Sequence, residues 1–189
     1  RTDVERPWVP YRRHVIAKPG TAGQVRGVLR GLASRPRKPL QESVLSSAEV
    51  RTALAGTIAE IDPDLEIWDT VRTGQFAPAV PRRRRLLYMD DLFSERYAAM
   101  LRDLDGTTNA NPGGEFQKLL PGPARALLAS PRVDRPLLEL ERRLVAAEEV
   151  RQPQWFDGTL LISPEETATL RTRTAAPGIG TLPPLLREP

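Results

Sequence analysis

The residues best suited to hold another molecule form a run of four arginines, Arg82 to Arg85. Each guanidinium carries a permanent charge and five donors in a fork that matches phosphate and carboxylate groups. Four adjacent side chains cannot all point the same way on a regular element, yet their combined field would attract phosphate or an acidic partner. The alternatives are a solvated linker, or ion pairs with the acidic residues of 139–149.

A second basic region lies near the N-terminus. Residues 1–38 hold ten Arg or Lys against two acids, whereas the remainder of the chain is net acidic. Trp8 and Tyr11 could stack on bases or riboses, although no recognised RNA- or DNA-binding module accompanies them. We expect contacts with nucleic acid or an acidic partner from Arg12, Arg13, Lys18, Arg35, Arg37, Lys38, Arg82, Arg83, Arg84 and Arg85.

The side chains that most enzymes use are scarce. The chain has no cysteine, and its single histidine, His14, has no acidic neighbour in the sequence that could orient it. No Walker A pattern occurs, and the glycines at 178 and 180 lack the preceding strand and following helix of a phosphate-binding loop. We therefore expect a protein that is not an enzyme and that uses no cofactor and no metal.

Two four-residue strings resemble known motifs. Tyr88-Met89-Asp90-Asp91 resembles the YMDD box of reverse transcriptases, which would imply metal-binding aspartates on a β-hairpin. No second polymerase motif supplies a further ligand, and the following residues have helical periodicity, so we interpret both aspartates as N-terminal residues of a helix. The string GGEF at 113–116 resembles part of the diguanylate cyclase signature, but the additional acid and the α/β pattern of that family are missing.

Hydrophobic periodicity and capping residues predict the helices. In the segment after Asp134 we expect a buried stripe that includes Leu144 and Ala147, with Glu148 and Glu149 on the opposite face. Gly27 weakens its helix unless another backbone approaches it closely. Residues 159–162 are expected to form no more than an edge strand or an extended segment. The predicted helices cover residues 21–32, 46–61, 63–72, 90–105, 134–151 and 163–170.

Nineteen prolines interrupt the chain at short intervals. The expected fold class is mainly α, a small irregular helical body of short proline-punctuated helices with extended N- and C-terminal arms. We expect a basic arm at 1–20, a helical body at 21–174 with linkers near 35–45, 75–85 and 106–114, and an extended Pro/Gly-rich arm at 175–189. No run of residues is long and apolar enough for a membrane span.

Extended arms gain little alone but can bury area along a neighbour. We therefore expect a non-catalytic structural subunit of a large multi-protein or ribonucleoprotein assembly, in an organellar ribosome or another mitochondrial complex. A start at Arg1 and not at Met is expected to reflect processing or trimming. The alternatives are a free-standing nucleic-acid-binding factor and a viral or phage structural component. The residues expected to dock on protein partners are Trp8, Tyr11, Leu182, Leu185 and Leu186.

Overall fold

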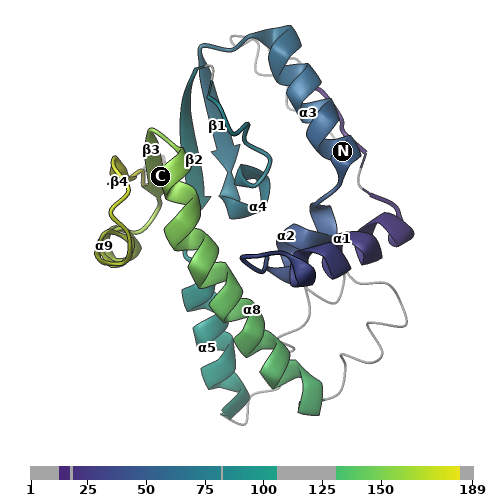
Figure 1. The fold of residues 1–189 in the computed structure, drawn as a ribbon. Helices are drawn as coiled ribbons and strands as arrows, with labels where there is room; N and C mark the ends of the chain where they lie inside the picture. Colours follow the sequence, from purple (N-terminus) through teal and green to yellow (C-terminus); the bar gives the residue numbers. More distant parts are fainter. Residues whose placement is uncertain (1–12, 18, 82, 106–130, 184–189) are drawn as a thin grey trace, which may run out of the picture.

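The centre of the molecule is a sheet of four parallel strands (Figure 1). The structure, a computed structural model, describes residues 13–17, 19–81, 83–105 and 131–183. The strands follow one another across the sheet in the order in which they occur in the chain. They are β1 (Leu65–Asp69), β2 (Arg84–Asp90), β3 (Gly158–Leu161) and β4 (Ile179–Thr181).

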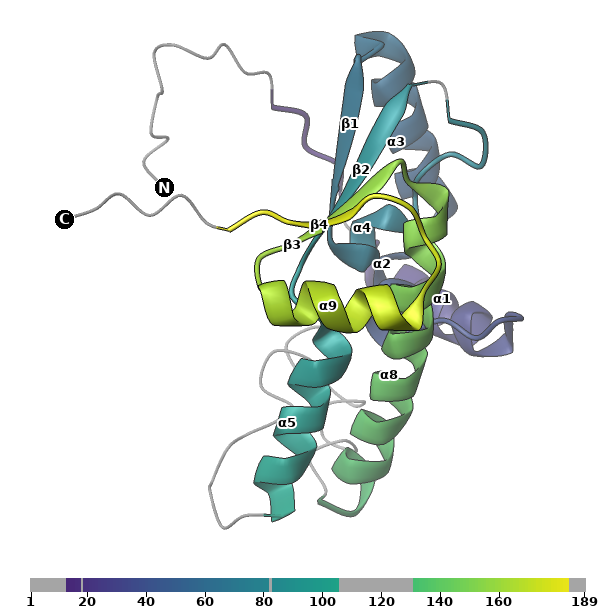
Figure 2. The same cartoon turned by 90° about the vertical axis from the view of Figure 1, so that its left-hand side faces the viewer.

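The strand order explains where the helices lie. Helix α4 (Thr70–Gly74) joins β1 to β2, helices α5 (Phe93–Asp105) and α8 (Pro131–Arg151) with the 3₁₀-helix η1 (Gln152–Trp155) join β2 to β3, and α9 (Pro164–Arg173) joins β3 to β4. Crossover connections between parallel strands are almost always right-handed. Since each connection here leads to the next strand in the same direction across the sheet, all of them lie on the same face of the sheet. Figure 2 shows α4 and α8 on one side of the sheet, whereas the other side of β1 and β2 carries no helix among the described residues.

The core lies between the sheet and these helices. Trp68, Leu87 and Leu161 point from the strands into it, and Val145 of α8 and Leu170 of α9 meet them from the other side. α5 and α8 form an antiparallel pair that extends beyond the carboxyl ends of the strands, as both views show (Figures 1 and 2). One apolar layer therefore holds all three crossovers against a single face of the sheet.

Three helices precede the sheet: α1 (Thr21–Ala33), α2 (Leu40–Leu45) and α3 (Ala48–Ile61). α1 packs on α2 through glycine, since a Cβ at Gly31 would lie 2.8 Å from the Cβ of Ser43. A Cβ at Gly27 would overlap the backbone carbonyl oxygen of Ser43, so the expectation that another backbone approaches Gly27 closely is confirmed. Ser47 caps α3 by accepting the Val50 N–H at 3.0 Å, one residue later than the predicted cap, and α3 ends at Ile61 as predicted.

The predicted mainly-α fold class is wrong, because the structure is an α/β mixture with a four-stranded parallel sheet. β1 occupies part of the predicted helix 63–72, and Asp90, predicted to start a helix, is the last residue of β2. Leu65 and Ile67 face outward while Glu66 and Arg85 face inward, so neither strand has the apolar–polar alternation of a half-buried strand. β3 pairs on both sides and is an internal strand, not the edge strand that was expected.

The buried face of α8 also differs from its prediction. Ala147 is exposed, whereas Glu148 and Glu149 are buried along with Glu141. The buried positions still recur at helical spacing, but the stripe is displaced by about one residue and contains carboxylates. Since hydrophobicity alone located the stripe, charged residues that belong to it were assigned to solvent.

Candidate functional site

The most unusual surface of the described residues is the face of the parallel sheet on which none of their helices packs, which we call the open face. Parallel sheets are normally covered on both faces. Here Ile67 and Leu65 on β1 are 66% and 45% exposed, and Leu182, directly after β4, is 50% exposed. Leu86 of β2 and Leu160 of β3 lie between them and are half-buried. The open face is thus a continuous apolar surface formed by alternate residues of neighbouring strands.

On the strands of the open face, the charged residues lie at the two ends, and the outward residues between them carry no charge. Arg84 starts β2 at the amino end, opposite Leu65 in the ladder. At the carboxyl end, Asp69 lies opposite Tyr88, whose hydroxyl donates to Oδ1 of Asp90 at 3.5 Å. Loss of water contact, and then the charges of Asp90 and Asp69, raises the pKa of Tyr88. The open face is therefore positive at one end, apolar in the middle and negative at the other end.

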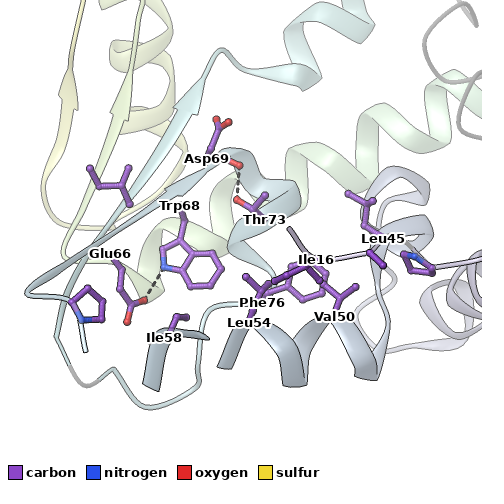
Figure 3. A pocket seen from close by; sticks show the side chains of 14 residues that line it. Ile16, Leu45, Val50, Leu54, Ile58, Glu66, Trp68, Asp69, Thr73 and Phe76 are labelled. Carbon is purple, nitrogen blue, oxygen red and sulfur yellow. Dashed lines mark hydrogen bonds between the residues drawn. The ribbon is translucent and has the colours of Figure 1, made fainter. Parts of the chain in front are cut away.

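An apolar groove of about 510 Å³ adjoins the open face at the edge of β1 (Figure 3). Val50, Leu54 and Ile58 of α3 form one wall, and Trp68 and Phe76 form the other. The indole Nε1 of Trp68 donates to Oε2 of Glu66 at 2.9 Å, which places a carboxylate at one end of the groove. Ile67 lines the groove and also lies on the open face, so the two apolar surfaces are continuous.

The N-terminal segment contributes to the same groove. Ile16, Ala17 and Pro19 line it together with α3 and β1. Val15, one residue away, points outward and is 79% exposed. This part of the expected arm thus lies on its own domain.

The four arginines of the run do not act together. Arg83 forms an exposed ion pair with Asp62 at 3.0 Å, and not with the acidic residues of α8. Arg84 lies on the open face, while Arg85 points to the opposite side and is buried. Successive residues of a strand face opposite sides, which separates these charges. Arg82 lies outside the described residues.

The other expected contact residues are scattered. Arg35 and Arg37 are exposed between α1 and α2, whereas Lys38 turns inward and donates to Oε1 of Gln75 at 3.4 Å. Of the expected docking residues, Leu182 is exposed on the open face. Arg13 is exposed in the N-terminal segment. Outside the described residues lie Trp8, Tyr11, Arg12, Lys18, Leu185, Leu186 and the GGEF string at 113–116.

The YMDD string does not lie on a hairpin. Its first three residues belong to β2, which is parallel to both neighbouring strands. Asp90 has a left-handed backbone, with φ at 67°, and Asp91 accepts hydrogen bonds from the side chain of Arg96. Within the described ranges, no group of three or more His, Cys, Asp or Glu side chains is placed to hold a metal ion.

Sequence reasoning missed a set of buried carboxylates between α2, α5 and α8. Burial, and then the charge of Glu148, raises the pKa of Glu42 to about 9. Burial also raises the pKa of Glu149 to about 7, although Oε1 accepts the Ser94 N–H at 2.9 Å. Glu141 accepts the N–H groups at the start of α2 and stabilises that helix end. The helical spacing of Glu141, Glu148 and Glu149 with Leu138 and Val145 was the signal available in the sequence.

These carboxylates connect the helices to one another. Oε1 of Glu42 accepts from Nε2 of Gln152 at 3.3 Å, and the same amide reaches Glu148, which pairs with Arg151. These contacts join α2 to α8, although Oε2 of Glu42 and Oε1 of Gln152 are buried without a hydrogen-bond partner.

Comparisons with known proteins add no family. The chain matches no protein-family model, no curated protein and no solved structure. Across the described part of the chain, every helix is too short or too polar to cross a bilayer. The open face and its adjoining groove are therefore the features on which a functional account rests.

Proposed function

We propose that this chain is a non-catalytic subunit that assembles through the open face of its parallel sheet, with a second copy of itself as the partner. The observation that carries the proposal is the exposed apolar surface formed by Leu65, Ile67 and Leu182 on a class of sheet that is normally buried on both sides. Exposed apolar surface of this kind typically marks an interface.

The charge distribution favours a second copy over an unrelated partner. A two-fold axis in the plane of the interface and perpendicular to the strands lays the amino end of one sheet over the carboxyl end of the other. Arg84 of one copy then approaches Asp69 and Asp90 of its partner, and the same contacts occur twice. A surface with one positive and one negative end is in this way complementary to itself.

The apolar middle of the open face fits the same arrangement. Facing sheets pack about 10 Å apart with interdigitating side chains. Ile67 and Leu86 lie close to the proposed axis, so they would pack against their own counterparts. The groove beside β1 extends this surface, and a side chain of the second copy can enter it next to Ile67.

The strand order argues against the usual alternative for an α/β protein. Doubly wound enzymes bind ligands where the strand order reverses, because the crossovers part at that point and leave a crevice. The order β1-β2-β3-β4 contains no reversal. The mitochondrial or ribosomal setting, and RNA as a partner of the basic arm, stay predictions from the sequence.

Sedimentation of the purified chain over a range of concentrations tests the proposal. We expect a dimer for the native sequence and a monomer for Ile67→Glu, because the new charge would lie in the apolar middle of the interface. Ile61→Glu is the matched control, since Ile61 is 51% exposed at the end of α3 and is not part of the open face. A native chain that stays monomeric at every concentration, or an Ile67→Glu variant that dimerises normally, contradicts the proposal.

A further inference from the structure

A second pocket, of about 590 Å³, lies at the amino end of the sheet. It is separate from the groove beside β1. The segment before β2 forms one wall with Pro78 and Pro81, and η1 contributes Trp155. Arg51 of α3 and Arg85 of β2 bring two guanidinium groups to the same pocket. This volume is in the range of pockets that hold small molecules.

Arg85 is the most unusual residue of this pocket. Its side chain is almost completely buried, with 4% of the residue exposed. Nη1 donates to the carbonyl of Pro78 at 2.6 Å, and the guanidinium carbon lies 5.4 Å from the centre of the Phe156 ring. Nε is buried and has no hydrogen-bond partner. Among the described residues no carboxylate forms an ion pair with this guanidinium.

Two acids near Arg85 make other contacts. Glu66 lies opposite Arg85 in the ladder and on the same side of the sheet, and its Oε2 accepts the indole N–H of Trp68. Oδ2 of Asp157 accepts the backbone N–H of Arg85 at 2.8 Å and thereby joins the starts of β2 and β3. A buried charge without an ionic partner is costly, and a bound anion would remove that cost. Arg85 is therefore a buried cation that makes no ion pair with a carboxylate of the described residues.

Arg51 adds a second cation, on an exposed residue. Its Nη1 donates to the carbonyl of Gln75 at 3.3 Å, and its guanidinium lies 5.6 Å from the centre of the Phe76 ring. The charged residues that line the pocket are two arginines and Asp157, a net of one positive charge. A ligand with a single negative charge matches this balance.

We infer that this pocket binds a small organic carboxylate with an apolar or aromatic body. The carboxylate pairs with Arg85 and Arg51, which present the fork of donors that a carboxylate accepts best. The body lies against the indole of Trp155 and the rings of Pro78 and Pro81. This site uses the covered side of the sheet and does not depend on the open face.

Calorimetric titration with benzoate, phenylacetate and 3-phenylpropionate tests the inference. Benzamide is the neutral counterpart of benzoate, and inorganic phosphate is the anion without an apolar body. We expect at least one carboxylate to bind with Kd below about 1 mM, and benzamide to bind at least tenfold more weakly than benzoate. The Nε–H signal of Arg85 in the ¹⁵N spectrum should shift on binding, because its surroundings gain a negative charge.

Substitutions locate the site. Arg85→Met should raise Kd at least tenfold, since the hydrogen bonds lost are to a charged group. If Arg85→Met fails to fold, Arg51→Met still tests the site, because Arg51 is exposed and its replacement should not affect folding. We expect Arg51→Met to raise Kd about fivefold. Arg26→Met removes one exposed charge from α1 and should leave Kd within about twofold. Binding of phosphate alone, equal binding of benzamide, no binding of any carboxylate, or an unchanged Kd in Arg51→Met overturns the inference.

Discussion

Ile67 of β1 and Leu86 of β2 lie opposite each other in the parallel ladder, and both side chains face away from the helices. A cross-strand apolar pair of this kind belongs in an interior. Here Ile67 is exposed and Leu86 is half-buried, because the strand order sends the described crossover helices to the other side of the sheet. The topology itself thus leaves an apolar face of the sheet without a helix among the described residues.

The contact between α1 and α2 depends on glycine. A methyl group at Gly31 would meet the Ser43 side chain, including its Cβ at 2.8 Å, so Gly31→Ala should lower the free energy of unfolding by about 1–3 kcal/mol. Gly56→Ala is the matched control in α3, because a Cβ there has no atom within 4 Å. That change should stabilise the protein by about 0.5–1 kcal/mol. Urea denaturation of both variants measures the difference, and a stabilised Gly31→Ala variant would show that α1 does not pack as described.

Glu42 should make stability fall as the pH rises. Burial, and then the Glu148 carboxylate, raises its pKa from 4.5 to about 9 in the folded protein. The folded state therefore holds a proton that the unfolded state releases between these values. The stabilisation is complete below about pH 4.5 and is lost as the pH rises through 9. Glu149, with a pKa of about 7, contributes in the same direction over a narrower range.

Glu42→Gln separates this effect from others, because glutamine resembles the protonated carboxyl group. The variant should be more stable than the native chain at pH 9, by about 1–3 kcal/mol, and its stability should depend less on pH. Glu49→Gln, at an exposed position in the first turn of α3, is the control and should leave the pH dependence unchanged. Unfolding curves at pH 5, 7 and 9 measure this difference. If the free energy of unfolding of Glu42→Gln changed with pH as steeply as that of the native chain, the raised pKa of Glu42 would be contradicted.

Two neighbouring residues of the N-terminal segment should respond differently to charge. Ile16 lines the groove beside α3, so Ile16→Asp should lower the free energy of unfolding by about 1 kcal/mol. Val15 is 79% exposed, and Val15→Asp should change the free energy of unfolding by less than about 0.5 kcal/mol. Equal effects in thermal or urea denaturation would mean that this segment does not pack on the groove.

The sequence predicted most helices, and the reason lies in their caps and stripes. Ser163 accepts the Glu166 N–H and starts α9 where the capping pattern placed it. The strands were harder because β1 and β2 are apolar on both faces and carry Glu66 and Arg85 toward the helices. Short strands with charged inward residues have neither of the two periods by which strands and helices are told apart.

The candidate surface could not be predicted for a related reason. The open face exists only when β1, β2 and β3 lie side by side, and residues such as Ile67 and Leu160 are far apart in the chain. The arginine run was expected to act as one positive surface, but strand geometry separates Arg84 from Arg85. Their different roles depend on which side of the sheet each residue faces.

The most direct test of self-association through the open face is a charge exchange between its two ends. Arg84→Glu and Asp69→Arg each place like charges opposite one another in the proposed dimer, so each variant alone should dimerise at least about tenfold more weakly. Neither residue is buried, and Asp69 makes no side-chain capping hydrogen bond, so both variants should fold.

The decisive measurement is native mass spectrometry of the two variants mixed in equal amounts. In a mixed dimer, Glu at position 84 of one copy faces Arg at position 69 of the other, and the native pair forms at the second contact. We predict that the mixture gives a heterodimer while each variant alone stays monomeric at the same concentration. A mixture that remains monomeric, or single variants that dimerise as the native chain does, would contradict the claim that a second copy covers the open face.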